Sequence, residues 1–264
     1  MHNGFASFAQ DLAATCSGFN ADSHHFLDRA QESSFWFRCR NQLLADLTRQ
    51  WFPNAETVLE IGCGTGYVLA GLRQVLPRAR FAGSEVSTVG LEYAARRLGP
   101  DVSLFQMDAH AIPFSNEFDL IAACDVLEHL DDDVKALRET HRALKPGGGA
   151  LLTVPQHPLL WSEVDVLAHH QRRYRRGELS EKCRQAGLQV VVDTSFVISL
   201  LPLMMAQRLV HGRNKNYDSN AELSLSSWLD RLLFTILDME RRCIRMGARF
   251  PVGGSRVVVA LKGR

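Results

Sequence analysis

Two kinds of hydrophobic pattern alternate along the middle of the chain. Short apolar runs rich in Val, Ile, Leu and Phe occupy Thr57–Ile61, Arg80–Val86, Val102–Met107, Phe118–Cys124 and Ala150–Val154. The stretches between these runs carry apolar residues at helical spacing, as Tyr67–Leu76 does. Strands that alternate with helices predict βαβ units and a mostly parallel sheet, whose ligands bind at the carboxyl ends of the strands.

The flanks of this core have patterns of their own. Residues 24–51 have helical spacing, and residues 228–244 have the apolar stripe of an amphipathic helix. The strand pattern resumes in two runs, Gln189–Val197 and Arg256–Leu261. We predict four parts, namely an N-terminal helical cap (1–52), a ligand-binding core (53–197), a helical insertion (198–255) and a last core strand (256–264). The insertion fits a lid, a dimer contact or a surface that faces a membrane.

Composition narrows the class of protein without naming a function. The 264 residues are 46% hydrophobic and 22% charged, which is typical of a globular chain. The net charge of +1 gives no overall attraction to nucleic acid or to an acidic membrane. Six scattered cysteines without a Cys-x-x-Cys pair argue against a disulfide scaffold or a structural zinc site. With no secretory signal pattern and no long apolar span, we expect a cytoplasmic protein.

The most informative stretch is Val58–Gly66, where an apolar run enters a turn with glycine at positions 62, 64 and 66. Glycine allows a tight turn and a close approach of a ligand, and the following helix N-terminus favours negative ligand charge. The spacing is one residue short of a dinucleotide fingerprint, and no Lys follows Gly66 as in a phosphate-binding P-loop. Glu60 would repel a pyrophosphate but would attract a ligand that carries an ammonium and a sulfonium.

Acidic residues follow the next strands of the predicted sheet. Glu85 ends the second run, and its two carboxylate oxygens match the two hydroxyls of a ribose. This feature alone does not separate NAD from S-adenosylmethionine. Asp108 follows the third run, where it could accept the amino group of an adenine, and Met107 offers an apolar contact. The fourth run ends at Asp125.

This order of glycines and acids resembles the class I S-adenosylmethionine-dependent methyltransferases over about residues 31–264. The most specific segments are Val58–Gly66, Phe118–Leu130, Leu144–Pro155 and His157–Tyr174. Within the family, the chain is similar to a bacterial methyltransferase type 11/12-like branch with a Phe-Trp-Phe helix and a His-x-Arg-Arg-Tyr loop. The resemblance implies a Rossmann-like, doubly wound α/β sheet of seven strands with an antiparallel last strand. It implies S-adenosyl-L-methionine as cofactor, bound by Glu60, Gly62, Cys63, Gly64, Glu85, Val86, Asp108, Ala109 and Asp125.

The acceptor of the methyl group is expected beside the region that follows the fifth run. A His with a pKa near neutrality can take a proton from the acceptor, and Arg forks can hold a phosphate or carboxylate. Our candidates for catalysis are His170, His157, His129 and Tyr174, and for substrate binding Trp161, Arg172 and Arg173. The arginines are also explained by ion pairs with surface acids. The resemblance leaves the acceptor open among small molecules, lipid-linked molecules and glycan precursors.

Several alternatives stay open at this point. Asp125, Glu128 and His129 have the spacing of metal ligands, but an acid at a helix start and a half-buried His explain them as well, and we predict no metal. The basic loop around Tyr174 also has the make-up of a nucleic-acid patch, which the net charge disfavours. An NAD-dependent oxidoreductase and a non-catalytic adenosine-ligand-binding protein are the rival functions. Peripheral membrane contact and a homodimer remain open.

Overall fold

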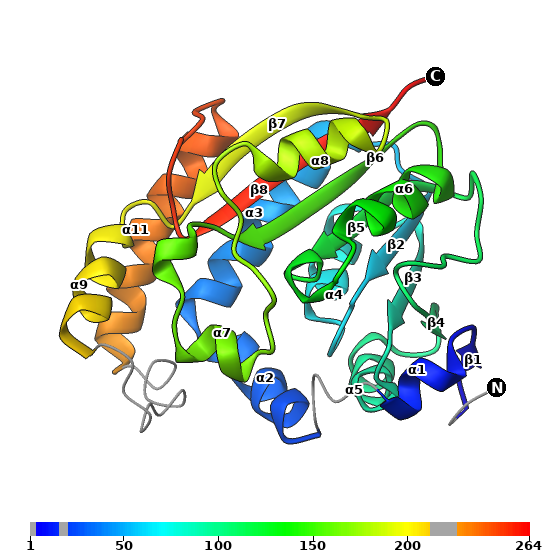
Figure 1. Ribbon diagram of the computed structural model, residues 1–264, viewed down its shortest axis with the longest axis horizontal. Coiled ribbons are helices and arrows are strands. Elements are labelled where there is room, and N and C mark those ends of the chain that lie inside the picture. Colours follow the sequence, from blue (N-terminus) through cyan, green and yellow to red (C-terminus); the bar gives the residue numbers. More distant parts are fainter. Residues whose placement is uncertain (1–3, 16–20, 212–225) are drawn as a thin grey trace.

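The computed structural model describes residues 4–15, 21–211 and 226–264. In these residues a single twisted sheet lies between two layers of helices (Figure 1). The strand order is β1-β4-β3-β2-β5-β6-β8-β7. The strand bounds are β1 Ala6–Ser7, β2 Thr57–Ile61, β3 Arg80–Glu85, β4 Val102–Gln106, β5 Phe118–Cys124, β6 Leu144–Pro155, β7 Leu188–Phe196 and β8 Ser255–Lys262.

The described helices connect and cover these strands. Their bounds are α1 Gln10–Thr15, α2 Ala21–Ser33, α3 Phe35–Trp51, α4 Tyr67–Val75, α5 Thr88–Leu98, η1 Leu127–His129, α6 Asp133–Ala143, η2 Pro158–Leu160, α7 Glu163–Leu167, α8 Glu178–Gln185, α9 Leu201–His211 and α11 Ser227–Arg245. In Figure 1, α6 and α8 lie in front of the sheet, and α3 lies behind it. None of the described helices is long and apolar enough to cross a bilayer.

Strict alternation of side chains along the central strands produces two separate cores. Val58 of β2 packs with the leucines of α3 and α4 on one face, whereas its neighbour Leu59 packs with α6 and α8 on the other. All five residues of β2 are therefore buried, as expected for a parallel strand covered on both faces. The strand order reverses between β2 and β5, so the ligand crevice is expected at their carboxyl ends.

The predicted α/β fold is confirmed, with one difference in the number of strands. β8 is antiparallel to both β6 and β7, as the last strand was expected to be. The seven expected strands are joined by β1, which pairs with Phe105–Gln106 at the free edge of β4. Phe8 packs edge-on against Phe105 beside it, and Ser7 donates a hydrogen bond to Gln106 at 2.6 Å. Two residues carry no readable period, and β1 therefore left no signal in the sequence.

β6 also begins earlier than predicted, at Leu144 instead of Ala150. Gly148 and Gly149 must be glycine in this strand, because their neighbours leave no room for a side chain. A Cβ on Gly149 would lie 2.6 Å from the carbonyl oxygen of Ala260, and one on Gly148 would lie 2.9 Å from that of Asp119. The pairing with β5 shifts register between Phe118 and Leu120.

The two ends of the chain meet on one face of the sheet. α11 packs along α3, and the ion pairs Arg38–Asp230 and Asp46–Arg241 join the two helices. The buried Leu237 of α11 faces the core on this side. Part of the predicted insertion, residues 212–225, lies outside the described residues, as do residues 1–3 and 16–20 of the predicted cap. The division of the chain into domains stays a prediction.

Candidate cofactor and acceptor site

The turn after β2 is shaped by glycines that two different constraints require. Gly62, Gly64 and Gly66 all have positive φ, at 66°, 50° and 77°, where other residues are strained. A Cβ on Gly62 would also lie only 2.4 Å from Cγ2 of Val126, in the loop after β5. Glycine at position 62 therefore lets two neighbouring strand ends meet. A Cβ on Gly64 would meet no atom within 4 Å, so the space in front of this residue is open.

Glu85 links the loop after β3 to the same turn. Its carboxylate accepts hydrogen bonds from the main-chain N–H of Gly64 at 3.1 Å and of Val86 at 2.8 Å. Burial raises the pKa of Glu85, and these hydrogen bonds act against that rise. The Cys63 N–H donates to the carbonyl of Ser84 at 2.9 Å, just before Glu85. Five of the predicted cofactor residues, Gly62, Cys63, Gly64, Glu85 and Val86, therefore lie together.

Glu60 and Asp125 flank a cation that sequence reasoning missed. Arg40 of α3 is 7% exposed and forms an ion pair with Asp125. Burial raises the pKa of Glu60 to about 8, with Arg40 acting in the opposite direction. The Arg40 guanidinium lies over the rings of Trp36 and Phe37, at 4.6 and 5.4 Å from their centroids. The spacing in the sequence could have revealed this contact. Arg40 follows Trp36 by four residues and Phe37 by three, so the three side chains share one face of the helix.

Asp125 has a backbone that few residues tolerate. Its φ is 57°, and its Oδ1 accepts a hydrogen bond from the hydroxyl of Thr153 at 3.0 Å. A left-handed residue other than glycine costs about 1–3 kcal/mol, and such strain gathers at functional sites. The turn aims Asp125 at Arg40 and starts the short helix η1.

Asp108 and Ala109 stand at the end of β4, beside the loop that holds Glu85. The Asp108 carboxylate accepts from the His110 N–H at 2.8 Å and lies 3.0 Å from Nδ1 of the same ring. The main-chain N–H of Met107 donates to the carbonyl of Glu85 at 3.3 Å. Met107 and Ala109 are buried, at 2% and 6% exposure, and so give this edge an apolar lining.

Two predicted catalytic histidines lie against each other on the acceptor side. The rings of His129 and His170 make an edge-on contact at 4.8 Å between centroids. Glu128 beside them is fully buried, and none of the described residues hydrogen-bonds to either of its carboxylate oxygens. Burial, and then the nearby Asp125, raises the pKa of Glu128 well above its usual value. Burial, and then His170, lowers the pKa of His129 to about 4.

Asp165 fixes the orientation of His170. Its Oδ1 lies 2.9 Å from Nδ1 of His170 and accepts a hydrogen bond from Nε of Arg173 at 2.7 Å. Burial acts to raise the pKa of Asp165, but the hydrogen bonds from His170 and Arg173 hold it well below its usual value. Arg173, predicted to bind substrate, thus contacts Asp165. Trp161 lies at the rim of the same loop and is 36% exposed.

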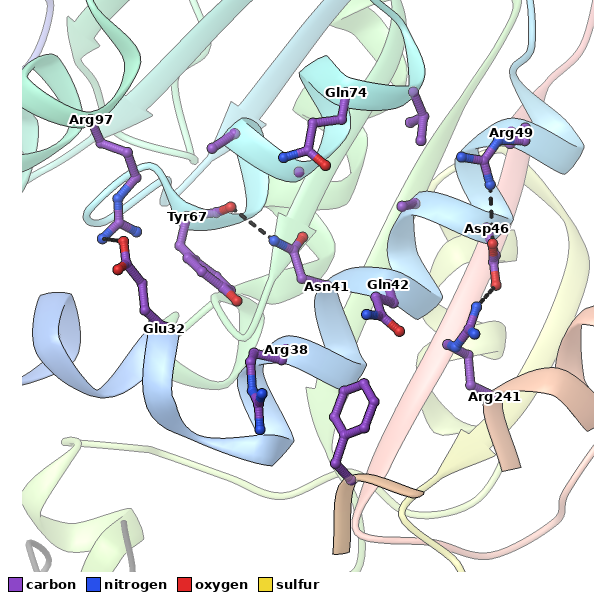
Figure 2. Close-up of a pocket in the computed structure, with 15 residues that line it drawn as sticks. Glu32, Arg38, Asn41, Gln42, Asp46, Arg49, Tyr67, Gln74, Arg97 and Arg241 are labelled. Carbon is purple, nitrogen blue, oxygen red and sulfur yellow. Dashed lines mark hydrogen bonds and ion pairs between the residues drawn. The ribbon is translucent and has the colours of Figure 1, made fainter. Parts of the chain in front are cut away.

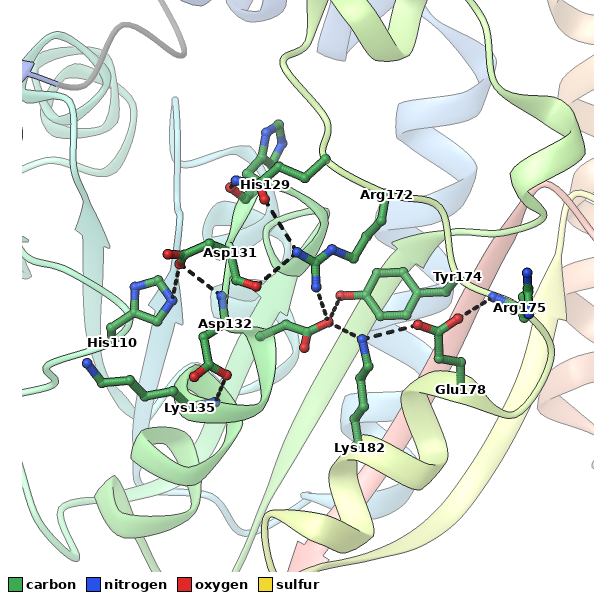
Figure 3. Close-up of polar contacts among 12 residues, drawn as sticks. His110, His129, Asp131, Asp132, Lys135, Arg172, Tyr174, Arg175, Glu178 and Lys182 are labelled. Atoms are coloured by element: carbon green, nitrogen blue, oxygen red, sulfur yellow. Dashed lines mark hydrogen bonds and ion pairs between the residues drawn. The ribbon is translucent and has the colours of Figure 1, made fainter.

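Tyr174 and Arg172 belong to a separate polar network, which Figure 3 shows. The Tyr174 hydroxyl donates to Oδ2 of Asp133 at 2.5 Å, and Arg172 and Lys182 reach the same oxygen at 3.3 and 2.6 Å. Tyr174 is fully buried, and burial followed by the contact with Asp133 raises its pKa. These contacts tie α6 to α8 and to residues 168–177 between α7 and α8, which are predicted to border the acceptor and are called the acceptor loop below. They give Tyr174 and Arg172 structural partners.

His157 stands apart from the histidine pair. It has a φ of 64°, and its main-chain N–H donates to the carbonyl of Tyr174 at 2.9 Å. Burial, and then Arg256, lowers the pKa of His157. The structure shows no contact between its ring and His129 or His170 among the interactions of the described residues.

A groove of about 790 Å³ lies elsewhere, between α3, α4 and α11 (Figure 2). Its described lining includes Asn41, Tyr67, Arg97 and Arg241, and none of the predicted site residues. The Asn41 amide donates to the carbonyl of Tyr67 at 3.0 Å across it. The groove is therefore formed where helices pack against one another, and none of the acidic residues at the strand ends lines it.

Comparison with known proteins agrees with this geometry. Residues 58–148 match the family model described as a methyltransferase domain. The ubiquinone/menaquinone biosynthesis C-methyltransferase of Desulfotalea psychrophila is 36% identical over 98 residues, 36% of this chain and 40% of the relative. The trans-aconitate 2-methyltransferase of an Azoarcus species is 34% identical over 136 residues, 52% and 51% of the two chains. The chain thus spans about half the length of the curated relatives that it matches.

Solved structures share the fold at low sequence identity. A chain of the complex between the Haloferax volcanii Trm112 methyltransferase activator and a methyltransferase has a TM-score of 0.59 at 21% identity, covering 90% of this chain and 93% of that one. The Haemonchus contortus phosphoethanolamine N-methyltransferase 2 bound to S-adenosyl-L-methionine has a TM-score of 0.56 at 21% identity, covering 85% and 53%. The [4+2]-cyclase SpnF has a TM-score of 0.55 at 22% identity, covering 86% and 82%.

The sheet order, the glycine turn and the matched domain define a Rossmann-like methyltransferase fold. Residues 58–148 thus match a methyltransferase domain, and the curated relatives named above are methyltransferases, a class of enzyme that uses S-adenosylmethionine as cofactor.

Proposed function

We propose that the chain transfers the methyl group of S-adenosylmethionine to an acceptor that is a small molecule, a lipid-linked molecule or a glycan precursor. One observation carries this proposal. The glycine turn, Glu85 and the Asp125–Arg40 pair converge where β2, β3 and β5 end, on both sides of the switch point. The relatives act in quinone biosynthesis or on trans-aconitate, according to their names, which favours a small acceptor.

The predicted cofactor residues divide the ligand among them. Glu85 takes the ribose hydroxyls, and Asp108 and Ala109 border the adenine. The main chain of the turn from Gly62 to Gly64 holds the methionine end, where the open space in front of Gly64 admits it. Bound S-adenosylmethionine supplies a methyl group that its sulfonium has already activated.

Charge at the methionine end explains why Arg40 is paired with Asp125 and lies near Glu60. Arg40 offers a planar fork to the methionine carboxylate, while Asp125 and Glu60 attract the ammonium. A nearby cation favours the ionised form of a buried carboxyl. Cofactor binding therefore lowers the pKa of Glu60 from about 8 and releases a proton at neutral pH.

The acceptor meets the methyl group beside Glu128, His129 and His170. Transfer from a sulfonium is an in-line displacement, so the main task is to align the reactants and exclude water. A hydroxyl acceptor must also lose its proton, and this cluster is the proposed place for that loss. Arg173 and Arg172 hold the acceptor loop through Asp165 and Asp133, and Trp161 offers an apolar contact at its rim.

Production of S-adenosylhomocysteine from a panel of hydroxyl, amine and carboxylate acceptors tests the activity. With a substrate in hand, His170→Ala should lower kcat at least about 100-fold while cofactor affinity stays within a factor of two. His25→Ala is the control, because the His25 side chain on α2 is exposed. Cofactor binding without turnover on any acceptor would favour the non-catalytic binding protein. A loss of cofactor affinity in His170→Ala with unchanged kcat would move His170 out of the acceptor site.

A further inference from the structure

The cluster of Glu128, His129 and His170 has the chemistry of a metal centre. Glu128 and His129 come from η1 after β5, and His170 comes from the loop that follows α7. Each residue offers one ligand atom, a carboxylate oxygen or a ring nitrogen, and these atoms all lie within 4.8 Å of one another. Sequence spacing alone grouped Asp125 with Glu128 and His129. The fold replaces Asp125 with His170, because the Asp125 carboxylate is held by Arg40 and Thr153.

A second observation at the same place concerns the carboxyl group of Glu128. The Glu128 side chain is fully buried, and no described residue hydrogen-bonds to either oxygen. The nearest ring nitrogen, Nε2 of His170, is 3.9 Å from Oε1, which is too far for a hydrogen bond. A buried carboxyl group without a partner costs about 1–3 kcal/mol, and proteins rarely keep one without a ligand or a reaction to serve.

The surroundings orient both imidazoles as metal ligands are oriented. Nδ1 of His170 faces Oδ1 of Asp165 at 2.9 Å, so Nδ1 carries the proton and Nε2 presents its lone pair to Glu128. Asp165 is itself fixed by Arg173 at 2.7 Å and by the Ser162 N–H at 2.8 Å. A hydrogen bond to the main chain of His169 holds His129. Histidines that bind metals usually have such a second partner, often a carboxylate or a backbone carbonyl.

We propose that Glu128, His129 and His170 bind a divalent transition-metal ion, with Zn²⁺ as the representative ion. Two imidazole nitrogens and one carboxylate oxygen suit Zn²⁺, Fe²⁺ or Co²⁺, whereas Mg²⁺ and Ca²⁺ prefer ligand sets made of oxygen. Bonds of about 2.1 Å in a tetrahedral site separate ligand atoms by roughly 3.4 Å. The side chains must therefore close in by about 1 Å when the ion binds.

Three protein ligands leave a coordination position open for the acceptor. There the ion would lower the pKa of an acceptor hydroxyl, which would lose its proton to water. The oxygen lone pair then forms a bond to the methyl carbon while the bond between that carbon and sulfur breaks, and the sulfonium becomes a neutral thioether. This role of the ion rests on the proposed function, but the binding of the ion does not.

Calorimetric titration of ZnCl₂ into the chelator-treated full chain tests the site, with the visible absorption of bound Co²⁺ as a second readout. We expect one ion per chain in the wild type. Glu128→Gln and His170→Ala should weaken binding at least about 100-fold, and Asp165→Asn, which removes only the orienting partner, about 10–100-fold. His25→Ala, which removes an exposed imidazole from α2, is the control and should leave the affinity unchanged. Circular dichroism confirms that each variant is folded.

The outcomes separate this inference from the proposed function. No ion bound by the wild type overturns the metal site, even if S-adenosylhomocysteine is produced with an acceptor. Binding that survives in folded Glu128→Gln and His170→Ala places the ion elsewhere and also overturns it. Binding that these two variants lose, with no turnover on any acceptor, supports the metal site while the proposed function fails.

Discussion

Alanine at Gly62 and at Gly64, introduced one at a time, separates two reasons for glycine in one turn. Both residues have positive φ, at 66° and 50°, so alanine at either should cost about 1–2 kcal/mol of backbone strain. Their surroundings differ. A Cβ at Gly62 would lie 2.4 Å from Cγ2 of Val126, whereas a Cβ at Gly64 would meet no atom within 4 Å.

The magnitudes follow from this difference. Forcing an extra carbon against Val126 adds about 1–3 kcal/mol. The free energy of unfolding should therefore fall by about 2–5 kcal/mol in Gly62→Ala and by about 1–2 kcal/mol in Gly64→Ala. Val126→Ala removes the two methyl groups in the way. The double variant Gly62→Ala/Val126→Ala should thus recover about 1–3 kcal/mol relative to the sum of the single variants.

Urea denaturation of the wild type and the four variants, analysed with a common m-value, measures these free energies. Calorimetric titration measures the affinity of each variant for S-adenosylmethionine. In Gly64→Ala the loss in binding free energy should exceed the loss in the free energy of unfolding, because its methyl group enters the open space of the site. If Gly62→Ala and Gly64→Ala are destabilised equally, and Val126→Ala recovers nothing in the double variant, the close contact between the loops after β2 and β5 is refuted.

Three further predictions follow from the charges and the buried network. Arg40→Met should weaken cofactor binding at least about 10-fold by titration calorimetry, whereas Arg38→Met, which loses a pair with Asp230 away from the turn, should not; equal effects would contradict the role of Arg40. The uncharged form of Glu60 stabilises the cofactor-free fold at low pH, and this contribution is lost as pH rises through about 8. The free energy of unfolding of Glu60→Gln, measured relative to that of the wild type, should therefore increase between pH 4.5 and 8. A difference that does not change with pH would disprove the raised pKa. Tyr174→Phe should lower the free energy of unfolding by about 1.5–3 kcal/mol in urea, because Asp133 loses one hydrogen bond, and an unchanged value would count against the buried network.

The sequence predicted the central strands well because their burial leaves a direct record. β2 and β5 are covered on both faces, so they appear as unbroken apolar runs whose ends lie within a residue of the predicted ones. The turn after β2 could also be predicted from local sequence, because glycines at positions 62 and 64 indicate residues with positive φ. The acids at strand ends follow from the strands themselves.

Features that depend on tertiary contact were not readable. β1 is too short to show a period, and the strand character of Gly148 and Gly149 comes from β5 and β8 and not from their own preference. Arg40 meets Asp125 only because α3 packs against one face of the sheet. The partnership of Asp165 with His170 likewise needs the turn after α7 to close.

The segment that matches known methyltransferases, residues 58–148, holds only part of the site. It carries the glycine turn, Glu85 and Asp125, whereas Arg40 precedes it and Asp165 and His170 follow it. Divergence in the loop after β6 can therefore change what is methylated, whereas a change at Arg40 would also alter the donor site. A search for relatives with the same chemistry should weigh the loop after β6 first.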